Sequence, residues 1–251
     1  MDILQGLLVL TAGFLCGVIN IIAGGGSLIT LPLLIGLGLP ADVANGTNRI
    51  GVLLQDISGT WKFQKKHVLP LRRSLILSVP VLIGSIFGIL FAVKLDHKVM
   101  NWVIFFILLF LLCFMLFGQD LLFKERQEKT FKPTLLDFII YLAIGFYGGF
   151  IQVGMTYLIL GATLIRNGGR LVTANAIKIF LNLIILPLAI ILFFIHGEID
   201  WVYGILLGIG SSLGGITGVK FAVAWNPKTI RKTILSMIGM SLLYMLFFQI
   251  L

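Results

Sequence analysis

The stretch GVINIIAGGGSLITLPLL, residues 17–34, decides the fold of this chain. It is apolar enough to form one long helix, but three consecutive glycines at positions 24–26 interrupt it. A glycine in a helix interior costs about 1 kcal/mol relative to alanine, so three in a row predict a break. We therefore expect a broken helical hairpin whose turn is formed by Gly24, Gly25 and Gly26.

The composition places the chain among integral membrane proteins. Of its 251 residues, 59% are hydrophobic and 12% are charged, and the mean hydropathy is +1.08. A soluble domain carries about twice that charged fraction. Runs long enough to cross about 30 Å of hydrocarbon lie near 4–22, 43–61, 74–93, 99–118, 135–153, 171–195, 201–219 and 229–250.

The distribution of lysine and arginine favours two hairpins over eight simple crossings, because these residues concentrate in cytoplasmic loops. If every run crossed once, nine cations would lie inside and eight outside. If residues 4–39 and 135–165 are instead re-entrant hairpins, 15 cations lie inside and only Lys94 and Lys98 outside. The inside loops are then 62–73, 119–133, 166–170 and 220–232. This topology predicts that both termini face the periplasm.

The two halves of the chain resemble each other. IGSIFGILFAVKLDHK (83–98) aligns with LGGITGVKFAVAWNPK (213–228), which pairs Gly84 with Gly214. Shorter matches join AGFLCGVIN (12–20) to IGFYGGFIQ (144–152) and VANGTNRI (43–50) to VTANAIKI (172–179). Three full crossings per half would invert one half relative to the other, as in many secondary transporters.

We therefore predict an all-α polytopic membrane protein built of two inverted repeats. Each repeat consists of a broken, re-entrant helical hairpin and three transmembrane helices, which gives eight to ten membrane segments in all. The first repeat spans residues 1–118, a cytoplasmic linker spans 119–133, and the second repeat spans 134–251.

Two cations lie inside predicted membrane segments, and the repeat aligns them: Arg49 with Lys178. Each alone could extend its charge to the interface. As an aligned pair in inverted halves they are expected to meet near the midplane, where buried charges usually face a cavity. Asn175 and Asn182 share a helix face with Lys178, and Asn45 and Asp56 share one with Arg49, flanked by Thr47, Asn48 and Gln55.

Two cations among amides and hydroxyls predict an anion pathway. Backbone N–H groups at helix starts after the breaks suit an anion, and Ser27 is the expected N-cap and hydroxyl donor of the first. Asn20 and its repeat partner Gln152 precede the two turns and offer amide donors. Asp56 is expected either to carry a coupling proton or to pair with Arg49 or Lys62.

Other kinds of site have little support in the sequence. Cys16 and Cys113 lie in apolar runs without metal-ligand spacing, and the three histidines fall in loops. We predict no metal, no cofactor and no catalytic residues. The positive net charge of +9 follows from membrane topology and does not indicate nucleic acid.

Residues 13–51 resemble the N-terminal signature of the TauE/SafE sulfite exporter family: G-x-x-x-G, an asparagine, a glycine triplet, a proline and A-x-G-T-N. The two-half layout is similar over the whole chain. The resemblance implies a bacterial inner-membrane transporter of sulfite or organosulfonates, and it points to Asn20, Gly24 to Gly26, Thr47, Asn48 and Arg49. The second half departs from the pattern, because IQVGMTYLILG (151–161) keeps Gly154 but has no triplet.

The sequence thus predicts a secondary transporter, an exporter by resemblance, that carries a small sulfur-containing anion by alternating access through the bilayer. A passive anion channel and a membrane scaffold or assembly factor are the alternatives, and a homo-oligomer is left open. The predicted anion-binding residues are Arg49, Lys178, Asn20, Gly24, Gly25, Gly26, Ser27, Thr47, Asn48, Gln152, Asn175 and Asn182, with Asp56 for coupling.

Overall fold

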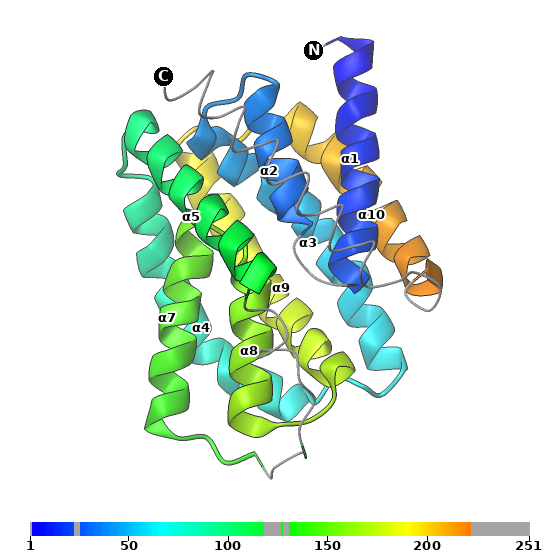
Figure 1. Ribbon diagram of the computed structural model, residues 1–251, viewed down its shortest axis with the longest axis vertical. Coiled ribbons are helices and arrows are strands. Elements are labelled where there is room, and N and C mark those ends of the chain that lie inside the picture. Colours follow the sequence, from blue (N-terminus) through cyan, green and yellow to red (C-terminus); the bar gives the residue numbers. More distant parts are fainter. Residues whose placement is uncertain (1, 23–25, 118–126, 128–130, 222–251) are drawn as a thin grey trace.

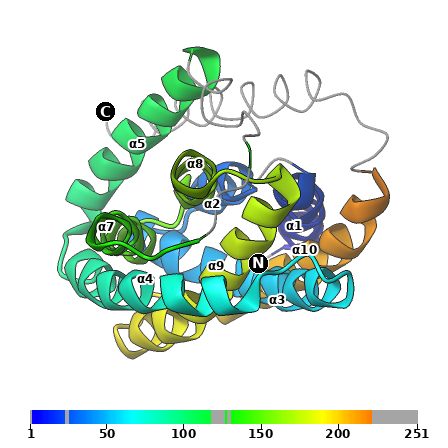
Figure 2. The same ribbon diagram turned by 90° about the horizontal axis from the view of Figure 1, so that it is seen from below.

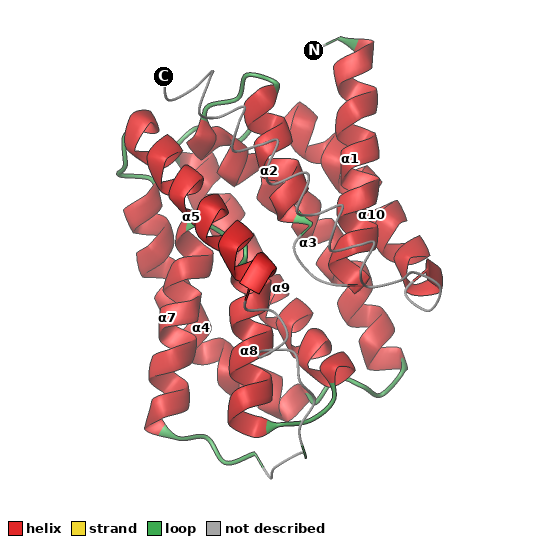
Figure 3. Ribbon diagram, viewed as in Figure 1, coloured by secondary structure: helices red, strands yellow, loops and turns green. Residues whose placement is uncertain are grey.

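The computed structural model describes residues 2–22, 26–117, 127 and 131–221, and the regular elements within these ranges are α-helices (Figure 1 and Figure 3). Their all-helical character agrees with the fold class predicted from the sequence. The helices are α1 (Ile3–Ile22), α2 (Ser27–Gly36), α3 (Ala41–Lys65), α4 (Leu71–Ala92), α5 (His97–Phe117), α7 (Leu135–Phe150), α8 (Met155–Asn167), α9 (Leu171–Ile195) and α10 (Trp201–Phe221).

Two pairs of helices fold back on themselves and enter the bundle from opposite ends (Figure 1). α1 runs inward from the end that carries the N-terminus, and α2 returns toward the same end. α7 runs inward from the other end, and α8 returns there. The 10 residues of α2 span roughly 15 Å by helical rise, about half of a hydrocarbon layer. The inner end of this short arm, at Ser27, therefore lies inside the bundle.

The second hairpin breaks without a glycine triplet. α7 ends at Phe150, and α8 begins at Met155 after a four-residue interruption at 151–154. Gly154 has a φ of +81°, a left-handed conformation that L side chains rarely adopt, and it occupies the N-cap position of α8. A single glycine is thus sufficient to turn the chain here.

Several helices are suited to a bilayer by length and composition. Ile3–Ile21, Leu71–Ala92 and Val172–Ile195 are each long and apolar enough to cross one, and α2, α5, α7, α8 and α10 contain shorter apolar stretches. α3 is equally long at 25 residues, but its polar stripe lowers its hydropathy. Large apolar side chains such as Phe87, Phe106 and Phe110 are exposed around the bundle, as a lipid-facing surface requires. The chain is a multi-pass membrane protein.

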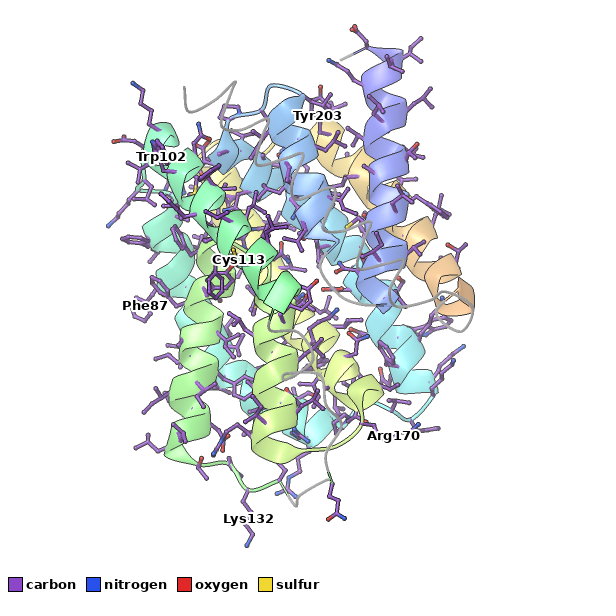
Figure 4. All side chains as sticks on the ribbon, in the orientation of Figure 1. Phe87, Trp102, Cys113, Lys132, Arg170 and Tyr203 are labelled. Carbon is purple, nitrogen blue, oxygen red and sulfur yellow. The ribbon has the colours of Figure 1, made fainter. Side chains whose placement is uncertain are left out.

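The described basic loops lie together at one end of the bundle. Lys132, before α7, and Arg170, before α9, lie at the end opposite the N-terminus (Figure 4). The α3–α4 connection, which follows Lys65, lies at that end as well (Figure 1). Trp102 and Tyr203 mark the other end (Figure 4). This arrangement is the one expected from the count of cations in the hairpin topology.

The two hairpins pack against helices of the opposite half. α1 packs against α10, and α7 packs against α4, while α3 and α9 contact each other. Figure 2 shows the α4–α7 pair on one side, the α1–α10 pair on the other, and α9 between them. The core of the protein is therefore an interface between the halves.

Glycines bring the paired helices into backbone contact. A Cβ atom added to Gly13 or Gly17 of α1 would collide with a backbone oxygen of α10, and one added to Gly145 or Gly149 of α7 would collide with one of α4. In the reverse direction, Gly84 of α4 faces Leu142, as Gly210 of α10 faces Leu10. In the packing, Gly84 therefore corresponds to Gly210, whereas the sequence repeat pairs Gly84 with Gly214. The two correspondences differ by about one helical turn of α10.

One local prediction about the first hairpin is wrong. Ser27 is the first residue of α2 and does not cap it, because Gly26 occupies the N-cap position with helical φ and ψ angles of −54° and −32°. The helix continues smoothly from Gly26 and leaves no extended residue for Ser27 to occupy. Gly24 and Gly25, the apolar run at 229–250 and most of the 119–133 linker lie outside the described residues.

Candidate functional site

The central helices α3 and α9 bury the two predicted membrane cations. Arg49 is 0% exposed and Lys178 is 1% exposed. Both are therefore held inside protein, which excludes the alternative that each extends to the interface. Because a buried charge needs partners of its own, the groups around each cation define the site.

Arg49 holds the inner end of α7. Its Nη1 donates to the carbonyl oxygen of Gly148 at 3.1 Å, and its Nη2 donates to those of Gly149 at 2.7 Å and Phe150 at 3.4 Å. Asn45, one turn earlier on α3, donates from Nδ2 to the same Phe150 oxygen at 2.9 Å. The guanidinium also lies 4.6 Å from the centre of the Phe193 ring.

Lys178 holds the inner end of α1 in the corresponding way. Its ammonium donates to the carbonyl oxygen of Asn20 at 3.4 Å. Asn175, one turn earlier on α9, donates from Nδ2 to the carbonyl oxygen of Ile21 at 3.2 Å. A cation and an amide from each half therefore cap the broken helix of the other half.

Helix electrostatics explain this reciprocal capping. The last carbonyls of an α-helix have no partner within the helix, and they form the negative end of its dipole. At membrane depth no lipid group can satisfy them, so a cation from a neighbouring helix does. In this structure both cations that were predicted to bind an anion therefore bind backbone carbonyl groups.

Asn20 connects the first break to α3. Its Oδ1 accepts a hydrogen bond from the backbone N–H of Gly26 at 3.0 Å, and its Nδ2 donates to Gln55 Oε1 at 3.2 Å. The same residue offers its backbone oxygen to Lys178. Asn20, Gly26 and Lys178, all predicted site residues, are therefore brought together at the first break.

Asp56 faces the cation of the opposite half. The carboxylate on α3 interacts with the Lys178 ammonium and the Asn182 amide, both on α9, and is 1% exposed. Its partner is thus Lys178 in place of Arg49 or Lys62, the two candidates suggested by the sequence. Lys62 instead donates to the backbone oxygen of Ile216 on α10 at 3.0 Å.

The remaining predicted residues have different surroundings. Thr47 accepts a hydrogen bond from the backbone N–H of Asp200 at 2.8 Å, at the start of α10. Asn48 accepts one from the Thr30 hydroxyl on α2 at 2.5 Å. Ser27 is buried at the start of α2, and Gln152 is buried within the second break. Thr47 therefore contacts α10 and lies apart from the groups at the two breaks.

Several buried polar atoms around the breaks have no hydrogen-bond partner among the described residues. They are Arg49 Nε, Gln55 Nε2, Asp56 Oδ2, Gln152 Oε1, Asn175 Oδ1 and Asn182 Oδ1. Buried polar groups in proteins are nearly always paired with protein, water or ligand. Unpaired buried polar atoms are therefore concentrated on α3, on α9 and in the second break, around the two cations.

Three residues that were not predicted as site residues lie beside predicted ones. Gln55, which flanks the polar stripe of α3, contacts Asn20, and Thr30 contacts Asn48. Glu198, in the loop before α10, contributes a negative charge near Arg49. The polar stripe on α3 indicated Gln55, whereas Thr30 and Glu198 approach the site only through the folding of separate segments.

Metal binding is not indicated in the described part of the chain, where no three His, Cys, Asp or Glu side chains cluster in a suitable way. Cys16 is buried and Cys113 is exposed, and both are free thiols. Among the described residues, the titratable groups at the two breaks thus include the cations and carboxylates already described, the Cys16 thiol and the Tyr147 phenol.

The chain matches the family model described as "Sulfite exporter TauE/SafE" over residues 9–245. A "Probable membrane transporter protein" of Haemophilus influenzae is 29% identical over 225 residues, which cover 90% of this chain and 88% of that relative. No solved structure matches the chain.

Two further relatives carry similar names. "Probable membrane transporter protein ORF9" of a Sinorhizobium species is 28% identical, over 88% of this chain and 84% of its own length. "Probable membrane transporter protein YfcA" of Escherichia coli K12 is 27% identical, over 92% of this chain and 86% of its own length. The similarity extends over both halves, and the names describe transporters and not enzymes.

Proposed function

The chain belongs to the TauE/SafE sulfite exporter family of membrane transporters, and on that premise we propose that it carries a small sulfur-containing anion, such as sulfite or an organosulfonate, across the bacterial inner membrane. Transport proceeds by alternating access between two inverted halves, residues 1–118 and 134–251, with both termini in the periplasm. The anion binds near the midplane, between the two breaks.

The observation that carries this proposal is the reciprocal capping of the breaks. Arg49 of the first half binds carbonyl groups of the second, and Lys178 of the second half binds one of the first. An anion that competes for either cation therefore weakens a contact between the halves. Binding is thereby linked to their relative movement, as alternating access requires.

The chemistry of the two cations suits a sulfite or sulfonate group. Arginine presents a planar fork of N–H donors that matches two oxygens at once, whereas lysine presents a compact charge. The Nε atom of Arg49 and the Nε2 atom of Gln55 are buried donors with no partner in the described structure. Amides of Gln152, Asn175 and Asn182 can present either a donor or an acceptor by rotation.

Uptake into sealed vesicles containing the purified protein tests the proposal. Sulfite, sulfate, thiosulfate, sulfoacetate and taurine are compared, and we expect saturable uptake and counterflow of a sulfur-containing anion. Flux that rises linearly with concentration and shows no counterflow would identify a passive channel. Absence of flux for every anion in vesicles that contain folded protein would favour the scaffold alternative.

A further inference from the structure

Asp56 is the buried carboxylate that faces the first break. It lies on α3, opposite Lys178 and Asn182 of α9, and its Oδ2 has no hydrogen-bond partner among the described residues. Both Asp56 and Lys178 are 1% exposed. A carboxylate and an ammonium buried this deeply depend on each other for charge compensation.

The surroundings of Asp56 contain few other titratable groups. The Cys16 thiol of α1 lies within electrostatic reach of both Asp56 and Lys178, and it contacts the hydroxyls of Thr30 and Ser211. α2 contains no titratable residue, and Tyr203 of α10 lies far from Asp56, at the other end, near Gln5. Lys178 is thus the cation that balances the Asp56 charge.

The second half has no carboxylate at the aligned position, and the acidic residue near Arg49 is Glu198, in the loop before α10. The alignment that pairs Arg49 with Lys178 places Ile185 of α9 opposite Asp56. Ile185 is buried and belongs to the hydrophobic core. The fold therefore does not require an acidic residue at this position, and the carboxylate is a specific feature of the first break.

Deepening the proposed function, on which this inference rests, we propose that Asp56 takes up one proton for each anion that binds Lys178. The anion replaces the carboxylate as the partner of the ammonium, and a proton from bulk water adds to the Asp56 carboxylate. No other bond forms or breaks, and release of the anion returns the proton. For a monoanion the net charge of the site is unchanged, so anion and proton cross together.

Calorimetric titration of the purified protein with sulfoacetate tests this coupling. Sulfoacetate remains fully ionised at neutral pH, so a proton taken up on binding comes from the buffer and enters the protein. Comparing two buffers of different ionisation enthalpy counts the protons bound per anion. We expect about one proton in the wild type, about none in Asp56→Asn with the anion still bound, and about one again in Asp56→Glu.

Asp137→Asn is the matched control, because Asp137 is also a buried carboxylate but pairs with Arg166 at the outer end of α7. It should bind sulfoacetate with the wild-type proton count. Anion binding to the wild type without proton uptake would overturn the coupling and leave the proposed transport intact, and so would uptake that persists in Asp56→Asn. Absence of binding to the wild type for sulfoacetate and sulfite alike would overturn both.

Discussion

The two breaks perform the same structural task with different chemistry. At the second break, Arg49 bonds to three successive carbonyl groups at 2.7–3.4 Å, and the negative charge near it comes from Glu198, in the loop before α10. At the first break, Lys178 makes one bond to a carbonyl of the described residues, at 3.4 Å, and shares its charge with Asp56. The comparison indicates that the second break is firmly held and that the first is suited to exchange of partners.

The glycine content of the breaks follows the same division. The first break has three glycines at 24–26, whereas the second turns on Gly154 with its left-handed φ of +81°. Tyr147 donates from its hydroxyl to the backbone oxygen of Val153 at 2.5 Å, which ties the second break to α7. We expect four substitutions to separate the two breaks, and they follow here from the largest effect to the smallest.

Replacing Arg49 with glutamine should have the largest effect on stability. The change leaves the carbonyl groups of Gly148, Gly149 and Phe150 without their cation, at a cost of about 3 kcal/mol or more. Thermal unfolding in detergent measures the loss. Arg49→Lys, which keeps the charge but not the fork, should recover part of it. A variant as stable as the wild type would contradict the firm hold on α7.

Replacing Lys178 with glutamine should also destabilise the protein, by about 3 kcal/mol, because it removes the hydrogen bond to Asn20 and leaves the buried Asp56 carboxylate without its cation. Its effect on sulfoacetate binding should be at least as large as that of Arg49→Gln. The same unfolding assay and calorimetric titration measure both quantities. An effect on sulfoacetate binding much smaller than that of Arg49→Gln would remove the distinction between the breaks.

Replacing Gly154 with alanine should cost about 1–2 kcal/mol, since L residues are disfavoured at positive φ. An added Cβ would also lie 2.7 Å from the Cδ1 atom of Leu111 on α5. Unfolding measurements on this variant test whether a single glycine shapes the second break. Gly38→Ala is a useful control, because Gly38 has a φ of +96° but open space around its Cβ position.

Replacing Arg166 with glutamine should have the smallest effect on stability. Its Nε donates to Asp137 Oδ1 at 2.8 Å, but 29% of the Arg166 side chain is exposed, and such pairs contribute little. Transport should continue at the wild-type rate. A large loss of transport would show that the outer end of the α7–α8 hairpin takes part in the movement between halves.

The sequence predicted the elements more fully than the contacts between them. The cation count led to two hairpins, and the repeat led to Arg49 and Lys178, because loop charges and aligned residues are found along the chain without knowledge of its packing. It did not show that each cation binds the opposite half, since contacts such as Arg49 to Gly149 join residues 100 positions apart. The capping role of Ser27 was predicted wrongly, because the helical conformation of Gly26 is not encoded in residue type.

The register between helices was also beyond the sequence. Glycines recur every four residues along α4 and α10, so an alignment can move by one helical turn and still match glycine with glycine. The backbone contacts of Gly84 and Gly210 identify the register of packing. Asp56 illustrates the same limit, because its partner Lys178 lies on another helix, while the nearer cations Arg49 and Lys62 do not pair with it.

The central claim is that cations that cap the breaks also serve the transported anion. Counterflow of sulfite or sulfoacetate in vesicles tests it most directly, with wild type, Arg49→Gln, Lys178→Gln and Lys62→Gln compared at equal amounts of folded protein. Lys62 is the matched control, a cation of α3 that bonds to Ile216 away from both breaks. We predict counterflow in the wild type and Lys62→Gln and none in the other two variants. Wild-type counterflow in Arg49→Gln or Lys178→Gln would contradict the account.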